Sequence, residues 1–227
     1  MTINPHTGLF IAFEGIDGSG KSAQADFIAK SLADVYKIGS GHILKIHEPT
    51  TGHFGRAIRK ILTHKDKTPD NPLWFQELFV QDRKDNLSYN VIPHLRRKGN
   101  VVLSDRYILS TFAYGMAQGL KYEGIERLHK DILGADFICP DITFIIDTDP
   151  DVALMRLQKR ESARPLEYFE AKRELMAETA KNYCWLADRF PNTHLISGDR
   201  PIGDVSEKIF KIIAKEKKLG GDPASAR

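Results

Sequence analysis

The sequence predicts an α/β fold in which a mainly parallel, five-stranded sheet is flanked by helices. Two observations favour this class. Apolar, strand-like runs alternate with segments of helical periodicity along nearly the whole chain of 227 residues. The first apolar run is followed by a glycine-rich stretch and then by a helical pattern, which is the order of a phosphate-binding strand–loop–helix unit.

The first such unit begins with the apolar run at 9–13, which predicts a buried strand. The glycine-rich stretch that follows fits the P-loop pattern G-x-x-x-x-G-K-[ST]. Apolar residues then recur every three or four positions and predict an amphipathic helix, at Ala25, Ile28, Leu32 and Val35. Glycines alone also make tight turns, but Lys and Ser in register after an apolar run favour a nucleotide site.

In a P-loop, backbone N–H groups close around phosphate oxygens, and the positive end of the following helix faces the same anion. The Lys21 ammonium would contact the outer phosphates, and the Ser22 hydroxyl would hold Mg²⁺, the expected cofactor with ATP. The expected ATP-binding residues are Gly15, Ile16, Asp17, Gly18, Ser19, Gly20, Lys21 and Ser22.

Four further strands are expected at 42–46, 101–103, 142–146 and 194–196. The expected helices are a short one with Ala57, Ile58, Ile61 and Leu62 inward, a long one at 73–98 bent at Pro93, and others at 110–118, 123–133, 151–159, 169–190 and from about 201. The polar stretch 63–72 is expected to be a loop. We expect one domain over 1–216 and a disordered tail at 217–227, where Gly, Pro, Ala and Ser predominate.

Composition gives no bulk signal for a nucleic-acid or membrane partner. The chain has 33 basic and 30 acidic residues, a net charge of +3, and its apolar runs are far shorter than a membrane span. Cys139 and Cys184 are far apart in the sequence and are interpreted as free thiols. Without a signal-peptide pattern, the expected location is the cytoplasm.

Polar residues stand at the ends of several predicted strands, where parallel sheets bind ligands. Glu48-Pro49 and Asp105-Arg106 are the main examples besides the P-loop. A carboxylate such as Asp105 at a strand end beside a P-loop is the usual group that binds Mg²⁺ or its waters. The Arg106 guanidinium can hold a phosphate with two hydrogen bonds. Alone, Asp-Arg would more often be a salt-bridged turn.

Together these motifs resemble the thymidylate kinase family of P-loop nucleoside monophosphate kinases. The resemblance lies in FEGIDGSGKSAQ at 13–24, Glu48-Pro49, FVQDR at 79–83, DRYILS at 105–110 and Ala113-Tyr114, and it covers residues 9 to about 215. It implies transfer of the ATP γ-phosphate onto dTMP to give dTDP, for dTTP synthesis. ATP and a deoxypyrimidine monophosphate would then be the ligands, and the enzyme would be a homodimer.

The resemblance also implies roles for individual residues on the acceptor side. Asp17 would contact the sugar 3′-hydroxyl, and Arg106 would hold the acceptor monophosphate. Phe79 and Arg83 are four residues apart on one helix face, an arrangement that suits stacking on a pyrimidine and donating to its carbonyl. The remaining expected acceptor residues are Glu48, Pro49, Ser110 and Tyr114.

The Arg-rich stretch after residue 158 resembles the small mobile lid of these kinases, at about 159–168. The P-loop interior contains no arginine, so Arg160 and Arg164 are the expected lid cations that stabilise the transferring phosphoryl group. Lys21, Asp105 and Arg106 complete the expected catalytic set. The segment 199–202 falls where the family packs adenine.

Two positions depart from the family pattern. His47 stands where many members have Arg, and Gly115 stands where many bacterial members have a Gln that recognises the thymine edge. A missing base-edge hydrogen bond weakens discrimination by roughly 1–3 kcal/mol.

Three alternatives therefore remain: a deoxynucleoside kinase, a kinase that also accepts dUMP-type acceptors, and a nucleotide-binding protein with weak turnover. A GTP-binding switch is disfavoured, because Asp131-Ile-Leu-Gly134 lies in a helical pattern and no guanine-reading segment follows it.

Overall fold

A five-stranded parallel sheet forms the centre of the computed structural model, which describes residues 2–63, 70–161, 168–170 and 172–215. The strand order is β3-β4-β2-β6-β7. The strands are β2 (Leu9–Glu14), β3 (Ile43–His47), β4 (Val101–Asp105), β6 (Ile142–Asp147) and β7 (Thr193–Ser197). The predicted fold class is thus confirmed. The ends of each predicted strand agree with those of an observed strand to within two residues.

The middle strands are the most buried because helices cover both faces of the sheet. Alternate side chains of β2 point to opposite faces: Leu9, Ile11 and Phe13 join one apolar core, and Phe10 and Ala12 join the other. The register pairs Phe13 with Asp105, so β2 and β4 end side by side. The P-loop therefore leaves the sheet next to the Asp105-Arg106 turn.

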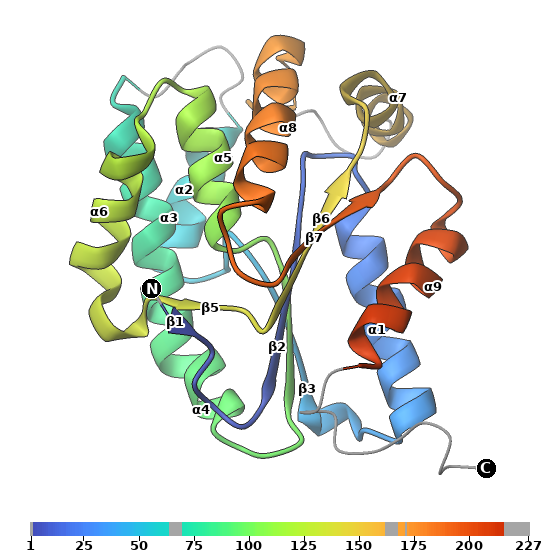
Figure 1. The fold of residues 1–227 in the computed structure, drawn as a ribbon. Coiled ribbons are helices and arrows are strands. Elements are labelled where there is room, and N and C mark those ends of the chain that lie inside the picture. Colours follow the sequence, from blue (N-terminus) through green and yellow to red (C-terminus); the bar gives the residue numbers. More distant parts are fainter. Residues whose placement is uncertain (1, 64–69, 162–167, 171, 216–227) are drawn as a thin grey trace.

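Helices form a layer on each face of the sheet (Figure 1). One face carries α1 (Lys21–Tyr36) and α9 (Ile202–Ile213), which pack together. On the other face the elements are α2 (His53–Leu62), α3 (Pro72–Asn86), α4 (Ile92–Leu95), α5 (Ile108–Ala117), α6 (Tyr122–Leu133) and α8 (Arg173–Ala187). Helix α7 (Pro150–Glu161) follows β6 and packs on α8.

The long helix expected at 73–98 is interrupted rather than simply bent. Between α3 and α4 the chain makes a π-helical turn, Leu87–Val91, and the Ile92 amide donates to the Leu87 carbonyl five residues back. Pro93 then lies in the first turn of α4, where its missing N–H costs no hydrogen bond. The helix ends at Leu95, three residues earlier than expected.

Other differences concern short or tertiary features. Helix α8 begins at Arg173, because Phe169 lies in a preceding turn with its ring against Tyr114 and Phe75. A two-stranded sheet of β1 (Thr2–Ile3) and β5 (Ile138–Cys139) was not expected, since two residues carry no periodicity. Short 3₁₀ turns occur at Ser40–His42 and Gly134–Asp136.

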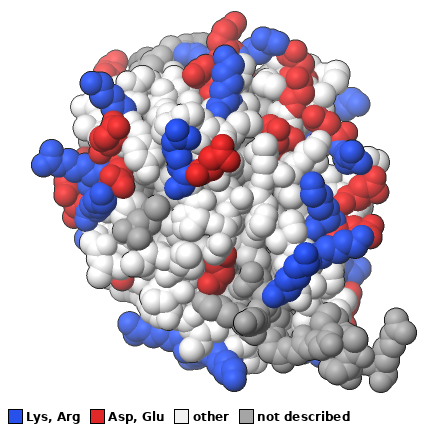
Figure 2. Space-filling model, viewed as in Figure 1, with Lys and Arg blue, Asp and Glu red and all other residues white. Residues whose placement is uncertain are grey.

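On the face in Figure 2, basic and acidic side chains are interspersed around a central uncharged band. Within the described residues, no helix is both long and apolar enough to cross a membrane. The tail expected at 217–227 lies outside the described residues.

Candidate functional site

The P-loop runs from the end of β2 into the first turn of α1, as the sequence predicts. Gly15 and Gly18 have positive φ angles of 132° and 81°. A Cβ at Gly15 would lie 2.6 Å from the Ile146 carbonyl oxygen, and one at Gly18 would lie 2.4 Å from that of Ala153. Both positions therefore require glycine. The close approach of β6 and α7 fixes the loop at the positive end of α1.

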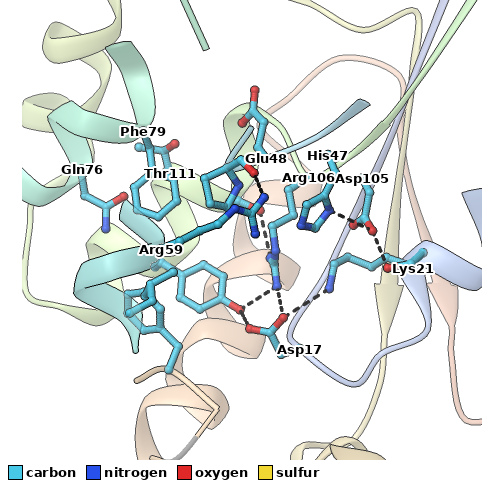
Figure 3. A pocket seen from close by; sticks show the side chains of 16 residues that line it. Asp17, Lys21, His47, Glu48, Arg59, Gln76, Phe79, Asp105, Arg106 and Thr111 are labelled. Carbon is cyan, nitrogen blue, oxygen red and sulfur yellow. Dashed lines mark hydrogen bonds and ion pairs between the residues drawn. The ribbon is translucent and has the colours of Figure 1, made fainter. Parts of the chain in front are cut away.

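A cavity of about 400 Å³ opens beside this loop (Figure 3). It is lined by Asp17, Lys21, Ser22, His47, Glu48, Pro49, Arg59, Leu62, Gln76, Phe79, Asp105, Arg106, Ser110, Thr111, Tyr114 and Phe169. Charged groups lie at its P-loop end, whereas Phe79 and Gln76 lie at the opposite end in Figure 3. Every expected acceptor-side residue except Arg83 is in this lining.

Arg106 is the most connected side chain of the cavity. It has a positive φ of 70° and its amide donates to the Phe13 carbonyl, which turns the side chain back over the P-loop. Its guanidinium donates to Asp17 Oδ1 at 2.6 Å, to Ser110 Oγ at 3.1 Å and to Tyr114 Oη at 3.2 Å. The site thus holds a buried guanidinium in one orientation.

Asp17 and Lys21 have shifted pKa values because of this arrangement. Burial alone would raise the pKa of Asp17, but the adjacent Arg106 and Lys21 outweigh it and lower the pKa to about 2. Burial lowers the pKa of Lys21 to about 8, and repulsion from Arg106 adds to that effect. The Lys21 ammonium donates to the Ile16 carbonyl at 2.9 Å and lies 4.0 Å from Asp17 Oδ1.

Asp105 and Ser22 form an oxygen-rich corner at the start of α1. The Ser22 hydroxyl donates to Asp105 Oδ2, and His47 Nδ1 lies 3.3 Å from the same oxygen. Burial opposes the ionisation of Asp105, but its contacts with His47, Lys21 and Ser22 hold its pKa well below the usual range. Among the described residues, Asp105 Oδ1 is buried with no hydrogen-bond partner. Hard oxygen donors with an unused carboxylate oxygen suit a small divalent cation.

Arg83 does not line the cavity but lies behind its wall. Its guanidinium bonds the Glu48 carboxylate through Nε at 3.1 Å and through Nη2 at 2.5 Å. It also donates to Thr111 Oγ1 and the Tyr107 carbonyl, and it contacts His129 Nε2 at 2.9 Å. Arg83 and Phe79 share a helix face as expected, but only the Phe79 ring reaches the cavity.

The structure adds two candidate site residues that the sequence did not indicate. Arg59 of α2 lines the cavity and donates to the Pro49 carbonyl. Arg156 of α7 donates to the Gly18 and Gly198 carbonyls beside the P-loop. Their one signal in the sequence, a basic residue inside an amphipathic helix, is too common to select them.

A second cavity of about 260 Å³ adjoins the other side of the P-loop. Its lining consists of Ser19, Gly20, Gln24, Ile146, Arg156, Gly198, Arg200, Ile202 and Val205. Arg200 and Ile202 belong to the segment expected on the adenine side. Among the described residues, Ser19 Oγ is a buried polar atom without a hydrogen-bond partner.

The lid expected at about 159–168 lies largely outside the described residues. Arg160 lies in the last turn of α7, but its side chain is outside the described part of the chain, and Arg164 lies outside it altogether. Asp131 and Gly134, considered for a GTP-binding switch, lie at the end of α6 and in the turn after it, and line neither of the two cavities.

Comparisons with known proteins agree on one family. The family model described as "Thymidylate kinase" matches residues 13–209. A thymidylate kinase of Ruegeria pomeroyi is 33% identical over 91% of this chain and 95% of its own length. A probable thymidylate kinase of Archaeoglobus fulgidus is 32% identical over 90% and 94%. The crystal structure of thymidylate kinase from Ehrlichia chaffeensis superposes with a TM-score of 0.70 at 25% identity, covering 91% of this chain and 98% of that one.

Proposed function

This chain belongs to the thymidylate kinase family, and on that premise we propose that its main cavity binds dTMP while its P-loop binds ATP. The protein is an ATP-dependent dTMP kinase that transfers the γ-phosphate of ATP to dTMP and releases dTDP and ADP. One observation carries the assignment of the site. The same cavity has Lys21 of the P-loop at one end and the Phe79 ring at the other, with Arg106 between them.

On the acceptor side, the pyrimidine would stack on Phe79, whose ring is held edge-on against Phe75 at 5.3 Å. Asp17 has a pKa of about 2 and stays ionised at working pH, so it can only accept hydrogen bonds, and a sugar 3′-hydroxyl could donate one to it. Arg106 and Arg59 would hold the 5′-phosphate. Glu48, Pro49, Ser110 and Tyr114 would shape the wall around the nucleotide.

On the donor side, the P-loop amides and Lys21 would bind the ATP phosphates, and the second cavity would take the adenine end beside Arg156 and Arg200. Ser22 and Asp105 would hold Mg²⁺, which fits the unpartnered Asp105 Oδ1. When bound, that ion would neutralise charge on the transferring phosphates.

The transfer itself needs positioning more than acid–base chemistry. An oxygen of the dTMP phosphate attacks the γ-phosphorus, and the bond to the oxygen bridging the β- and γ-phosphates breaks. The acceptor oxygen is already anionic, so no residue has to remove a proton. Lys21 and Arg106 would offset the charge of the transition state from the two sides, and Arg160 and Arg164 would add cations from the lid.

An ADP-release assay over dTMP, dUMP, UMP, CMP, AMP and thymidine tests this function. We expect the highest kcat/KM for dTMP, and weak activity with thymidine, because Arg106 and Arg59 need a phosphate to bind. A preference for thymidine over dTMP would instead indicate a deoxynucleoside kinase. Activity confined to AMP would contradict the proposal, as would ATP binding without turnover of any acceptor.

The assembly and location stay proposals as well. A homodimer is supported by apolar side chains exposed on α3 and the following π-turn, where Trp74 is 49% and Tyr89 78% exposed. A cytoplasmic location is supported by the two free thiols, Cys139 and Cys184. A single domain over 1–216, with its lid at about 159–168, also stays a prediction.

A further inference from the structure

The base end of the main cavity contains an amide that the proposed function has not used. Gln76 belongs to α3, and only 1% of its surface is exposed. Among the described residues that line the cavity, it is the one with a side-chain amide. Gln76 precedes Phe79 by three residues, so both side chains lie on one face of the helix. A base stacked on Phe79 would therefore present an edge to Gln76 (Figure 3).

Gln118 fixes the orientation of this amide. Gln76 Nε2 donates to Gln118 Oε1 at 2.6 Å, which leaves Gln76 Oε1 as a hydrogen-bond acceptor. Gln118 Nε2 is buried and has no hydrogen-bond partner within the described part of the chain. Within the described part of the chain, the bond to Gln76 is thus the one hydrogen bond that the Gln118 side-chain amide makes. A buried amide at a cavity wall is costly unless its remaining atom also finds a partner.

Gly115 of α5 leaves the space that Gln76 occupies. A Cβ at position 115 would lie 3.3 Å from Gln76 Cγ and 2.8 Å from Ile125 Cδ1. A larger residue there would therefore crowd Gln76. The glycine at position 115 consequently makes room for the amide side chain at position 76.

We propose that Gln76 recognises the base of the acceptor nucleotide, with Oε1 accepting a hydrogen bond from the N3–H of thymine, and that Gln118 is its positioning residue. The inference rests on the proposed function and deepens it. Thymine and uracil carry a hydrogen on N3, whereas cytosine presents a lone pair there. With its Oε1 acceptor facing the bound base, Gln76 would therefore favour dTMP and dUMP over dCMP.

The test compares steady-state kinetics of the wild type with Gln76→Leu, which keeps the approximate size but removes both polar atoms. We expect KM for dTMP to rise about tenfold with a much smaller change in kcat, and the preference for dTMP over dCMP to fall about tenfold. Gln118→Leu should shift both quantities in the same direction by less. Gln81→Leu is the matched control, since Gln81 is on the same helix and does not line the cavity.

A ligand-side change separates recognition from a merely structural role. N3-methyl-dTMP lacks the N3 hydrogen, so methylation should weaken equilibrium binding about tenfold more in the wild type than in Gln76→Leu. If Gln76→Leu does not fold, equal binding of dTMP and N3-methyl-dTMP to the wild type overturns the proposal.

Unchanged KM and unchanged dTMP preference in a folded Gln76→Leu enzyme also overturn it. That result would leave the kinase assignment intact, because turnover of dTMP would persist. Failure of the wild type to phosphorylate dTMP would instead contradict the proposed function itself.

Discussion

The pKa values of individual side chains at the P-loop depend on the groups packed around them. Lys21 is buried and lies near Arg106, and together these effects lower its pKa to about 8. Asp17, between the two cations, has its pKa lowered to about 2 because their attraction outweighs burial. The acid is thus ionised over the whole working range, whereas the lysine loses its proton just above neutral pH. Of these two groups, Lys21 is therefore the one that a rise in pH above neutral affects.

We predict that kcat/KM for ATP falls as pH rises above about 8. The free enzyme binds ATP productively only with a protonated Lys21, and above the pKa that fraction drops by up to tenfold per pH unit. Initial rates from pH 7.5 to 9.5, with dTMP fixed well below its KM so that ATP meets the free enzyme, check this. Lys21→Arg keeps its charge over that range, so its lower activity should stay flat. A wild-type profile without a fall up to pH 9.5 would contradict the prediction.

How far the sequence predicts individual site residues depends on how local their contacts are. The P-loop residues and Asp105-Arg106 follow from contiguous motifs at strand ends, and Asp17, Lys21 and Ser22 of the loop line the same cavity as Asp105 and Arg106. Arg59 could not be found in this way, because its role arises when α2 folds back over the Pro49 carbonyl. Arg83 shares the predicted helix face with Phe79, but periodicity cannot tell that Glu48 engages it behind the wall.

At the scale of elements, backbone geometry limits the P-loop more than side-chain chemistry does. The loop passes so close to β6 and α7 that Gly15 and Gly18 have no room for a Cβ. Some short elements could not be predicted from the sequence. The π-turn before Pro93 and the two-residue strands β1 and β5 depend on single hydrogen bonds or tertiary pairing, which leave no periodic pattern.

Two glycine substitutions should therefore have opposite effects. Gly18→Ala places a Cβ 2.4 Å from the Ala153 carbonyl oxygen at a φ of 81°, so we expect a loss of about 1–3 kcal/mol in the free energy of unfolding. It should also raise KM for ATP more than tenfold. Gly124→Ala, in the exposed first turn of α6 with no atom within 4 Å, should gain about 0.5–1 kcal/mol.

Urea unfolding and steady-state kinetics of both variants check this pair. Gly124→Ala should leave KM for ATP and dTMP unchanged, because α6 contributes no residue to the cavity lining. A Gly18→Ala protein with wild-type stability and KM for ATP would show that the close approach to α7 does not constrain the loop.

At the scale of the whole molecule, a buried polar cluster joins elements that are distant in the sequence. Arg83 of α3 bonds Glu48 after β3, Thr111 of α5 and His129 of α6. His129 Nδ1 donates to the Ile125 carbonyl at 2.8 Å, so the neutral ring can accept from Arg83 through Nε2. The cluster thus holds the wall of the nucleotide cavity, and it does so only while His129 is uncharged.

We predict that this cluster makes the protein acid-sensitive. Burial, together with repulsion from Arg83, lowers the pKa of His129 from 6.5 to about 3. Between those values the unfolded chain binds a proton that the folded chain does not. The free energy of unfolding should therefore decrease on acidification below about pH 6.5, by up to about 1.4 kcal/mol per pH unit from this residue.

Urea unfolding at pH 7, 6 and 5 measures that slope in the wild type and in His129→Gln. Gln cannot titrate, yet it offers an acceptor to Arg83, so the variant should start less stable and lose less on acidification. The ring also stacks between Phe112 and Phe137 at 5.1 and 5.2 Å, and losing this packing lowers stability equally at every pH. The difference between the slopes therefore isolates the proton. Equal slopes would mean that His129 is not the group through which acid lowers the free energy of unfolding.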